Sequence, residues 1–120
     1  MLKSRNIVWG GGITLAALLF ALTVSARTPQ VREISVRADG FSFSPSNIEV
    51  QKDEIVKVTF TAVDMPHSFT IDAYRISKRA AQGQTVTFEF RADRTGPFDF
   101  FCNLSQDERC KNMRGKLVVR

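Results

Sequence analysis

The chain has 120 residues, of which 43% are hydrophobic and 24% are charged, and its formal net charge is +5. A chain of this length holds at most one domain, and its basic residues are spread without a dense cluster, which argues against nucleic-acid binding. It has one histidine, no Ser-His-acid or Cys-His-acid spacing and no glycine-rich phosphate loop. A chain with a single histidine offers few groups for general acid–base catalysis, so we expect no enzymatic activity.

The first 26 residues have the pattern of an export signal or a membrane anchor. Lys3 and Arg5 precede an apolar run over residues 7–24, and small residues around Ala26 suit cleavage. The run of about 18 residues is at the lower limit for spanning a bilayer, so a cleaved signal and a tether both stay open. Both predict a periplasmic or extracellular protein, with residues 27–31 as a linker.

Residues 32–120 are predicted to form one all-β domain. Apolar residues recur with period two between turn signals, which is typical of half-buried strands. Such segments occupy residues 34–36, 41–43, 48–50, 55–63, 67–71, 85–90, 98–102 and 116–119. No sustained helical spacing occurs, and we expect at most a helical turn within residues 76–82. About seven short strands predict a β-sandwich or a small barrel.

Four side chains form the soft-metal ligand set of the chain: His67, Cys102, Cys110 and Met113. Strand alternation places His67 and Cys102 on core faces, at a strand start and a strand end. Antiparallel pairing of these strands would bring both side chains to one pole, where the following loop can add Cys110 and Met113. Imidazole, thiolate and thioether are donors that copper favours, and zinc also accepts Cys and His.

Each of these residues also has a simpler interpretation. His67 follows Pro66 and would serve equally as a hydrogen-bonded strand start. Met113 would fill a gap in the core. Cys102 and Cys110 would form a disulfide in an oxidising compartment. The four residues are more specific together than singly, because all fall at one predicted pole.

Several segments resemble the cupredoxin family, in particular the copper-binding domain of cytochrome c oxidase subunit II and its small secreted relatives. The likeness runs from about residue 32 to residue 120. The segments that carry it are Phe41-Ser42-Phe43-Ser44-Pro45, Ile48-Glu49-Val50, residues 64–71 (DMPHSFTI) and residues 94–102 (RTGPFDFFC). The resemblance implies a cupredoxin-like Greek-key β-sandwich, with His67 and Cys102 as copper ligands.

The last loop departs from both common patterns of that family. The mononuclear pattern Cys-x4-His-x4-Met would need a second histidine, which the chain lacks. The binuclear pattern Cys-x3-Cys-x3-His-x2-Met, counted from Cys102, falls on Gln106, Cys110 and Met113. Only the methionine is kept in that comparison, so we expect one metal ion rather than two. A second thiolate in place of a histidine favours Cu(I) over Cu(II).

Two functional hypotheses follow for the chain. In the first, it is an exported copper-binding protein, expected to be monomeric, for one-electron transfer or Cu(I) binding and delivery linked to respiration. Its partner would then be a redox protein or a protein that donates or accepts copper. In the second, it is a structural or interaction domain on a cupredoxin scaffold, with a Cys102–Cys110 disulfide and no metal.

Overall fold

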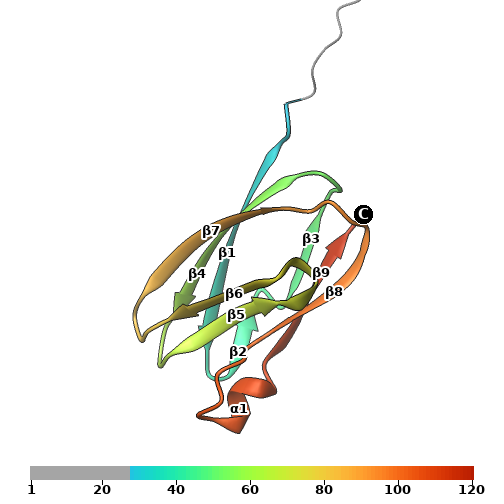
Figure 1. The fold of residues 1–120 in the computed structure, drawn as a ribbon. Helices are drawn as coiled ribbons and strands as arrows, with labels where there is room; N and C mark the ends of the chain where they lie inside the picture. Colours follow the sequence, from blue (N-terminus) through green and yellow to red (C-terminus); the bar gives the residue numbers. More distant parts are fainter. Residues whose placement is uncertain (1–27) are drawn as a thin grey trace, which may run out of the picture.

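The computed structural model describes residues 28–120, and the expected signal or anchor at residues 1–26 lies outside them. Within the described range the chain folds into nine strands with two short helical turns (Figure 1). In chain order these elements are β1 (Val31–Asp39), β2 (Ser42–Ser44), β3 (Asn47–Val50), β4 (Ile55–Ala62), β5 (His67–Ile71), the 3-10 turn η1 (Asp72–Tyr74), β6 (Ile76–Ala80), β7 (Thr85–Arg91), β8 (Gly96–Phe101), α1 (Glu108–Lys111) and β9 (Arg114–Val119). The expected all-β class is confirmed.

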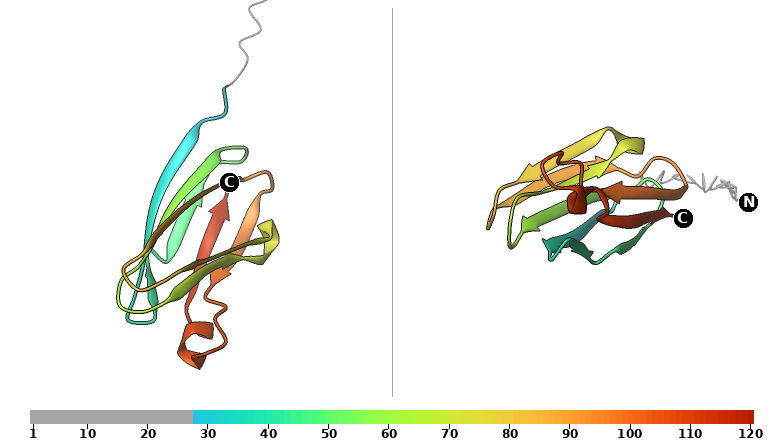
Figure 2. Two further views of the ribbon diagram at one scale, coloured as in Figure 1. Left: turned by 60° about the vertical axis from the view of Figure 1, so that its left-hand side comes forward. Right: turned by 90° about the horizontal axis from the view of Figure 1, so that it is seen from below.

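Two mixed sheets face each other in a sandwich (Figure 2). The first sheet has the strand order β2-β1-β4-β7, and the second has the order β3-β9-β8-β5-β6. β1 pairs with β4 in parallel and β3 pairs with β9 in parallel, while the other pairs are antiparallel. Each parallel pair therefore joins strands that are not consecutive in the chain.

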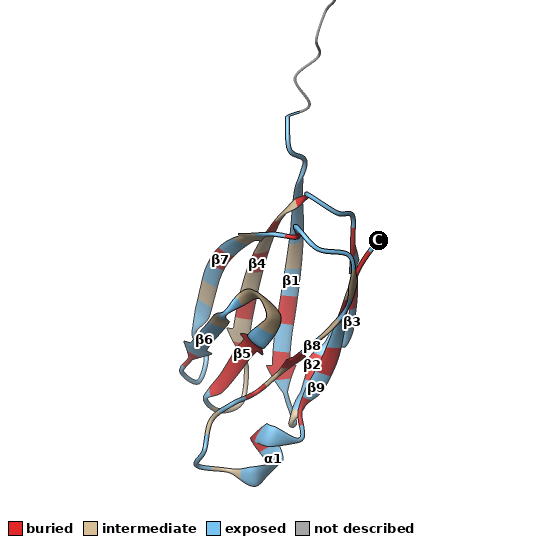
Figure 3. Cartoon of the chain, turned by 45° about the vertical axis from the view of Figure 1, so that its right-hand side comes forward, coloured by how far each residue is buried: buried red, intermediate tan, exposed pale blue. Residues whose placement is uncertain are grey.

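Period-two alternation fills the space between the sheets. Along β4, every second residue from Val56 to Ala62 is buried, as the sequence predicts (Figure 3). Aromatic rings form the centre of the core, where Phe69 and Phe100 stack with ring centroids 4.8 Å apart. Phe43 meets the Phe100 ring edge-on at 5.1 Å. Such aromatic pairs add to the stabilisation that burial alone provides.

The prediction of a helical turn within residues 76–82 is wrong. Residues 76–80 form β6, which pairs antiparallel with β5 from Ile71↔Ile76 to His67↔Ala80. The free edge of β5 offers a ladder of backbone hydrogen bonds, and this outweighs the weak helical preference of the Lys-Arg-Ala segment. β6 is thus the edge strand of its sheet, and its exposed Lys78 and Arg79 suit an edge.

We use the name site pole for the end of the sandwich where the β1–β2 turn, the start of β5 and loop 102–113 meet. β5 and β8 are antiparallel neighbours, with Thr70 opposite Phe101, so the start of one strand and the end of the other meet there as expected. The described chain begins at the opposite end of the sandwich (Figure 1). Among residues 28–120, no helix is long and apolar enough to cross a membrane.

Candidate metal centre

All four residues of the expected ligand set are buried at the site pole. The exposed fraction is 0% for His67 and Cys102, 1% for Met113 and 2% for Cys110. Backbone hydrogen bonds tie the loop together, because Met113 N–H donates to the Cys110 carbonyl at 3.0 Å and Cys102 N–H donates to the Met113 carbonyl at 3.4 Å. The strand geometry expected from the sequence therefore brings these side chains to one end of the core.

Cys102 and Cys110 are joined in a disulfide, with their Cα atoms 5.2 Å apart. Cys110 lies in α1, and the Asp107 side chain caps this turn by accepting the Arg109 N–H. In this oxidised state, the part of the chain that is described contains no group of three or more His, Cys, Asp or Glu side chains arranged to hold a metal ion. Metal binding by these sulfurs would first need two-electron reduction of the bond to two thiols.

Each sulfur of the pair accepts one backbone hydrogen bond. Ser68 N–H donates to Cys102 Sγ at 3.4 Å, and Leu104 N–H donates to Cys110 Sγ at 3.2 Å. Hydrogen bonds to a thiolate favour its charged form, and the thiolate is the form that binds metal ions. The backbone around the pair is therefore arranged to stabilise two thiolates after reduction.

A side-chain network fixes the backbone that carries Cys102. Asn103 N–H donates to Ser68 Oγ at 2.7 Å, and Ser68 Oγ donates to Asn103 Oδ1 at 2.6 Å. Asn103 Nδ2 also donates to Ser77 Oγ at 3.0 Å. This network joins the end of β8 to β5 and β6, so Cys102 is held on the sheet while Cys110 belongs to the loop.

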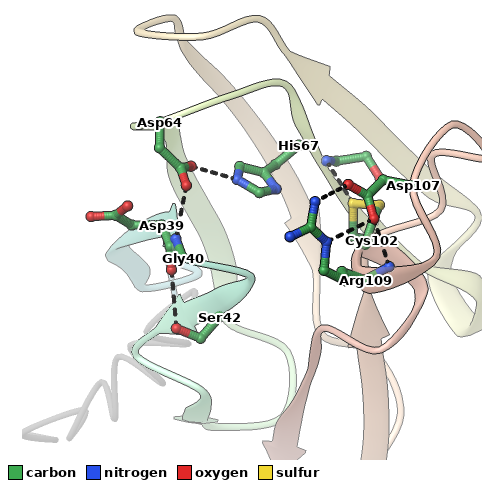
Figure 4. Close-up of polar contacts among 10 residues, drawn as sticks. Asp39, Gly40, Ser42, Asp64, His67, Cys102, Asp107 and Arg109 are labelled. Carbon is green, nitrogen blue, oxygen red and sulfur yellow. Dashed lines mark hydrogen bonds and ion pairs between the residues drawn. A yellow bond between two sulfur atoms is a disulfide. The ribbon is translucent and has the colours of Figure 1, made fainter.

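His67 is held by one ring nitrogen only. Its Nε2 lies 2.8 Å from Asp64 Oδ1, as Figure 4 shows. This hydrogen bond, together with one from Gly40 N–H, outweighs desolvation and lowers the pKa of Asp64. An ionised carboxylate can only accept, so His67 donates through Nε2–H. In the neutral imidazole the lone pair then sits on Nδ1.

The His67 Nδ1 atom is buried without a hydrogen-bond partner, the only such side-chain nitrogen or oxygen in residues 28–120. Burying a polar atom without a partner costs free energy, and folded proteins keep such an atom chiefly where it has a task such as binding an ion. The donor set therefore fits a soft metal ion once the disulfide is reduced: two thiolates, one free imidazole nitrogen and a buried thioether. It does not fit one while the disulfide is closed.

Sequence reasoning missed the residues that support this set. Asp64 flanks the histidine strand in the sequence, but its contact with His67 depends on the bend at Asp64-Met65. The sequence signal for this contact is the spacing of Asp64 and His67, three residues apart with a proline between them. The contact between Ser68 and Cys102 could follow from antiparallel pairing of β5 and β8, but only once their register is known.

The fold and the site together define a two-sheet β-sandwich with a buried histidine, a disulfide-bonded cysteine pair and a buried methionine at one pole. The chain belongs to the cupredoxin-like domain family, since the model of that family matches residues 12–119. A search of curated protein sequences found no match. The resemblance expected from the sequence motifs is thus confirmed at the family level.

Solved structures with the same fold have low sequence identity to this chain. A heme-copper terminal oxidase dimer matches with 18% identity and a TM-score of 0.66, over 80% of this chain and 68% of that one. Auracyanin A, a blue copper protein from Chloroflexus aurantiacus, matches with 17% identity and a TM-score of 0.64, over 75% of this chain and 99% of that one. The metal-binding domain of the Streptococcus pneumoniae Cu(I)-exporting ATPase CopA matches with 16% identity and a TM-score of 0.64, over 78% of this chain and 89% of that one. At these identities the likeness shows the fold.

Proposed function

We propose that this chain is an exported copper-binding protein that binds one copper ion, as Cu(I), when its cysteine pair is reduced. Cys102, Cys110 and His67 would be the main ligands, and Met113 would be a weaker one. The observation that carries the proposal is His67 Nδ1, which is buried and unpartnered at the same pole as a pair of buried cysteines whose sulfurs each accept a backbone N–H.

The chemistry of the donors favours copper in its reduced state. Two thiolates, a thioether and one imidazole form a soft set, which suits Cu(I). A bound copper ion would supply one-electron chemistry or serve as cargo. Of the chain's own residues, Asp64 orients His67 and keeps Nδ1 free, and the Ser68–Asn103 network fixes Cys102. Zn(II) would compete for the same Cys and His donors.

The disulfide makes copper binding dependent on redox state. Opening it consumes two electrons and two protons and gives two thiols, so the proposal requires a dithiol reductant in the compartment outside the cytoplasm. A redox partner or a protein that exchanges copper would then meet the site pole. Several proteins with this fold work with copper, including the oxidase and the CopA domain named above, which supports a role near respiration or copper handling.

Anaerobic titration of the reduced, exported protein with Cu(I) tests the proposal. We expect one copper ion per chain, ultraviolet absorption from Cu(I)–thiolate bonds and no EPR signal. The His67→Ala and Cys110→Ser variants should weaken binding, and the untreated disulfide form should bind no stoichiometric copper. A fully reduced protein that leaves Cu(I) with a weak competing chelator would overturn the proposal.

The closed disulfide itself favours a second candidate, a structural or interaction domain that uses the bond in place of a metal. Its buried cysteines would then stay oxidised throughout the life of the protein. Thiol titration and intact-mass measurement on protein exported into its native compartment separate the two candidates. A mass two hydrogens below that of the dithiol form, in every molecule and with no metal, favours the second candidate.

A further inference from the structure

The turn between β1 and β2 has an unusual residue at a strained position. Gly40 and Phe41 form a two-residue hairpin turn, and both have positive φ, 59° and 58°. Glycine adopts this conformation freely, but a bulky side chain makes it sterically strained. Strain of this kind persists only where surrounding contacts hold it, and such positions cluster at functional sites.

The contacts that hold Phe41 lead directly to the candidate site. Its ring meets the His67 ring edge-on, with centroids 6.0 Å apart and planes at 84°. The Arg109 guanidinium lies over the Phe41 ring, 4.2 Å from its centroid. Asp107 fixes that guanidinium through contacts of 3.1 and 2.9 Å. Phe41 therefore contacts the buried histidine as well as an exposed arginine next to Cys110.

The backbone of the same turn is also linked to His67. Gly40 N–H donates to Asp64 Oδ2 at 3.0 Å, and the other oxygen of that carboxylate holds His67 Nε2 (Figure 4). The turn can stay anchored through Asp64 while the Phe41 ring moves. Arg109 belongs to the loop that the disulfide closes, so the state of this loop decides how firmly the ring is held.

We infer that the Phe41 ring acts as a gate that covers His67. The cation–π contact of Arg109 with this ring acts as a latch that holds the gate closed. With the ring in place, His67 is fully buried. When the ring swings out while the turn stays anchored, the imidazole becomes accessible from the site pole. Passage of a metal ion through this gate rests on the proposed function, whereas the gating of His67 does not.

The single histidine of the chain makes a direct test possible. Diethyl pyrocarbonate modifies accessible imidazoles, so the ultraviolet signal of the modified ring reports on His67 alone. In the disulfide form without metal, Phe41→Gly removes the ring and suits the turn backbone, so the modification rate should rise by more than about tenfold. Arg75→Gly is the matched control, because Arg75 also has positive φ, 54°, but lies beyond the far end of β5. This control should react like the wild type.

Arg109→Ala tests the latch while the ring and the turn stay unchanged. Loss of an exposed cation–π contact should raise the modification rate about two- to fivefold. Urea unfolding of every variant separates local opening from general unfolding. An unchanged rate in Phe41→Gly, or an equal rise in Arg75→Gly, would overturn the gate.

A second measurement addresses metal passage in the reduced, copper-loaded protein. Phe41→Gly should lose copper to a chelator faster than Arg75→Gly does. Equal rates of loss would overturn the role of the gate in metal passage. A wild type that binds no copper, combined with faster modification of His67 in Phe41→Gly, would overturn the proposed function and leave the gate standing.

Discussion

Asp64 joins two parts of the site pole, His67 and the β1–β2 turn, through one carboxylate. Its two oxygens accept from His67 Nε2–H and from Gly40 N–H, so it sets both the orientation of the imidazole and the position of the β1–β2 turn. The ring nitrogen that it leaves free is the one without any partner. The availability of His67 as a ligand thus depends on a residue that would never touch the metal.

Replacement of Asp64 should therefore affect stability through hydrogen bonding. Asp64→Ala leaves the buried His67 Nε2–H without an acceptor, which should lower the free energy of unfolding by about 1–3 kcal/mol. Asp64→Asn keeps an amide oxygen that can accept the same bond, so its loss should be smaller. Urea unfolding at neutral pH measures both. Equal losses in the two variants would show that the hydrogen bond from His67 is not the cause.

Gly115 is required for a different reason, the close packing of β8 against β9. A Cβ atom built at Gly115 would collide with the Phe100 ring, which lies directly across the strand pair. Gly115→Ala should destabilise the protein by about 1–3 kcal/mol, because the buried ring must move within a full core. The neighbouring Lys116→Ala, which removes an exposed ion pair with Asp99, should have a much smaller effect. Thermal or urea unfolding compares the two.

Residue types and spacing were enough to predict that His67, Cys102, Cys110 and Met113 gather at one pole, because strand alternation fixes the side of the sheet on which His67 and Cys102 lie. His67 and Cys102 fall at one pole for that reason alone. Their supporting contacts were not predictable in the same way. The Phe41–His67 and Asp64–His67 contacts arise between a turn, a bend and a strand, where no period applies and side-chain direction depends on the local backbone.

At the level of elements, the sequence predicts half-buried strands with their faces and predicts the bounds of β5, but alternation does not predict that both faces of β5 are buried. β4 shows clean alternation and was predicted with its faces. All five residues of β5 are buried, although Ser68 and Thr70 are polar. Their burial is possible because each hydroxyl has a hydrogen-bond partner, Asn103 for Ser68 and Ser77 for Thr70. β6 was missed because a short Lys-Arg-Ala segment has little strand preference, and only its partner strand decides its conformation.

Glu54 ties the start of β1 to the turn before β4, at the pole opposite the site. Arg32 donates to its two oxygens at 3.2 and 3.3 Å, and Gln51 N–H donates to it as well. Burial alone would raise the pKa of Glu54, but these bonds outweigh it and lower the pKa below the ordinary value of 4.5. The ionised carboxylate therefore stabilises the folded state.

The pH dependence of stability should reveal this contribution. Above about pH 4.5, Glu54→Gln should cost about 1–3 kcal/mol, because it removes charge-assisted hydrogen bonds at a buried position. As the pH falls below that value, protonation favours the unfolded state, so the difference between wild type and Glu54→Gln should shrink. Glu49→Gln is the control, because its pair with Arg120 is exposed. A difference that stays constant down to acid pH would contradict the assignment.

For the whole molecule, most of the buried core lies between the two sheets and not in the loop at the site pole. Most residues of the core belong to β-strands, while Cys102, Cys110 and Met113 join it from a loop whose disulfide-bonded ends are eight residues apart. A core of this kind should survive reduction of the bond. The reduced protein should then be folded but less stable, with its two thiols and the free nitrogen of His67 at the same pole.

Stability measurements on the reduced protein test both proposed functions at once. Opening a loop of this length should cost about 2–3 kcal/mol in free energy of unfolding, if the chain-entropy account holds. A ligand that binds only the folded state restores stability, by about 2.7 kcal/mol at a free concentration one hundred times its Kd. Cu(I) should therefore raise the unfolding midpoint of the reduced wild type. The Cys102→Ser/Cys110→Ser double variant should show the low midpoint without that response. If Cu(I) leaves both proteins unchanged, the cysteine pair serves the fold as a cross-link, and the free nitrogen of His67 has a role other than copper binding.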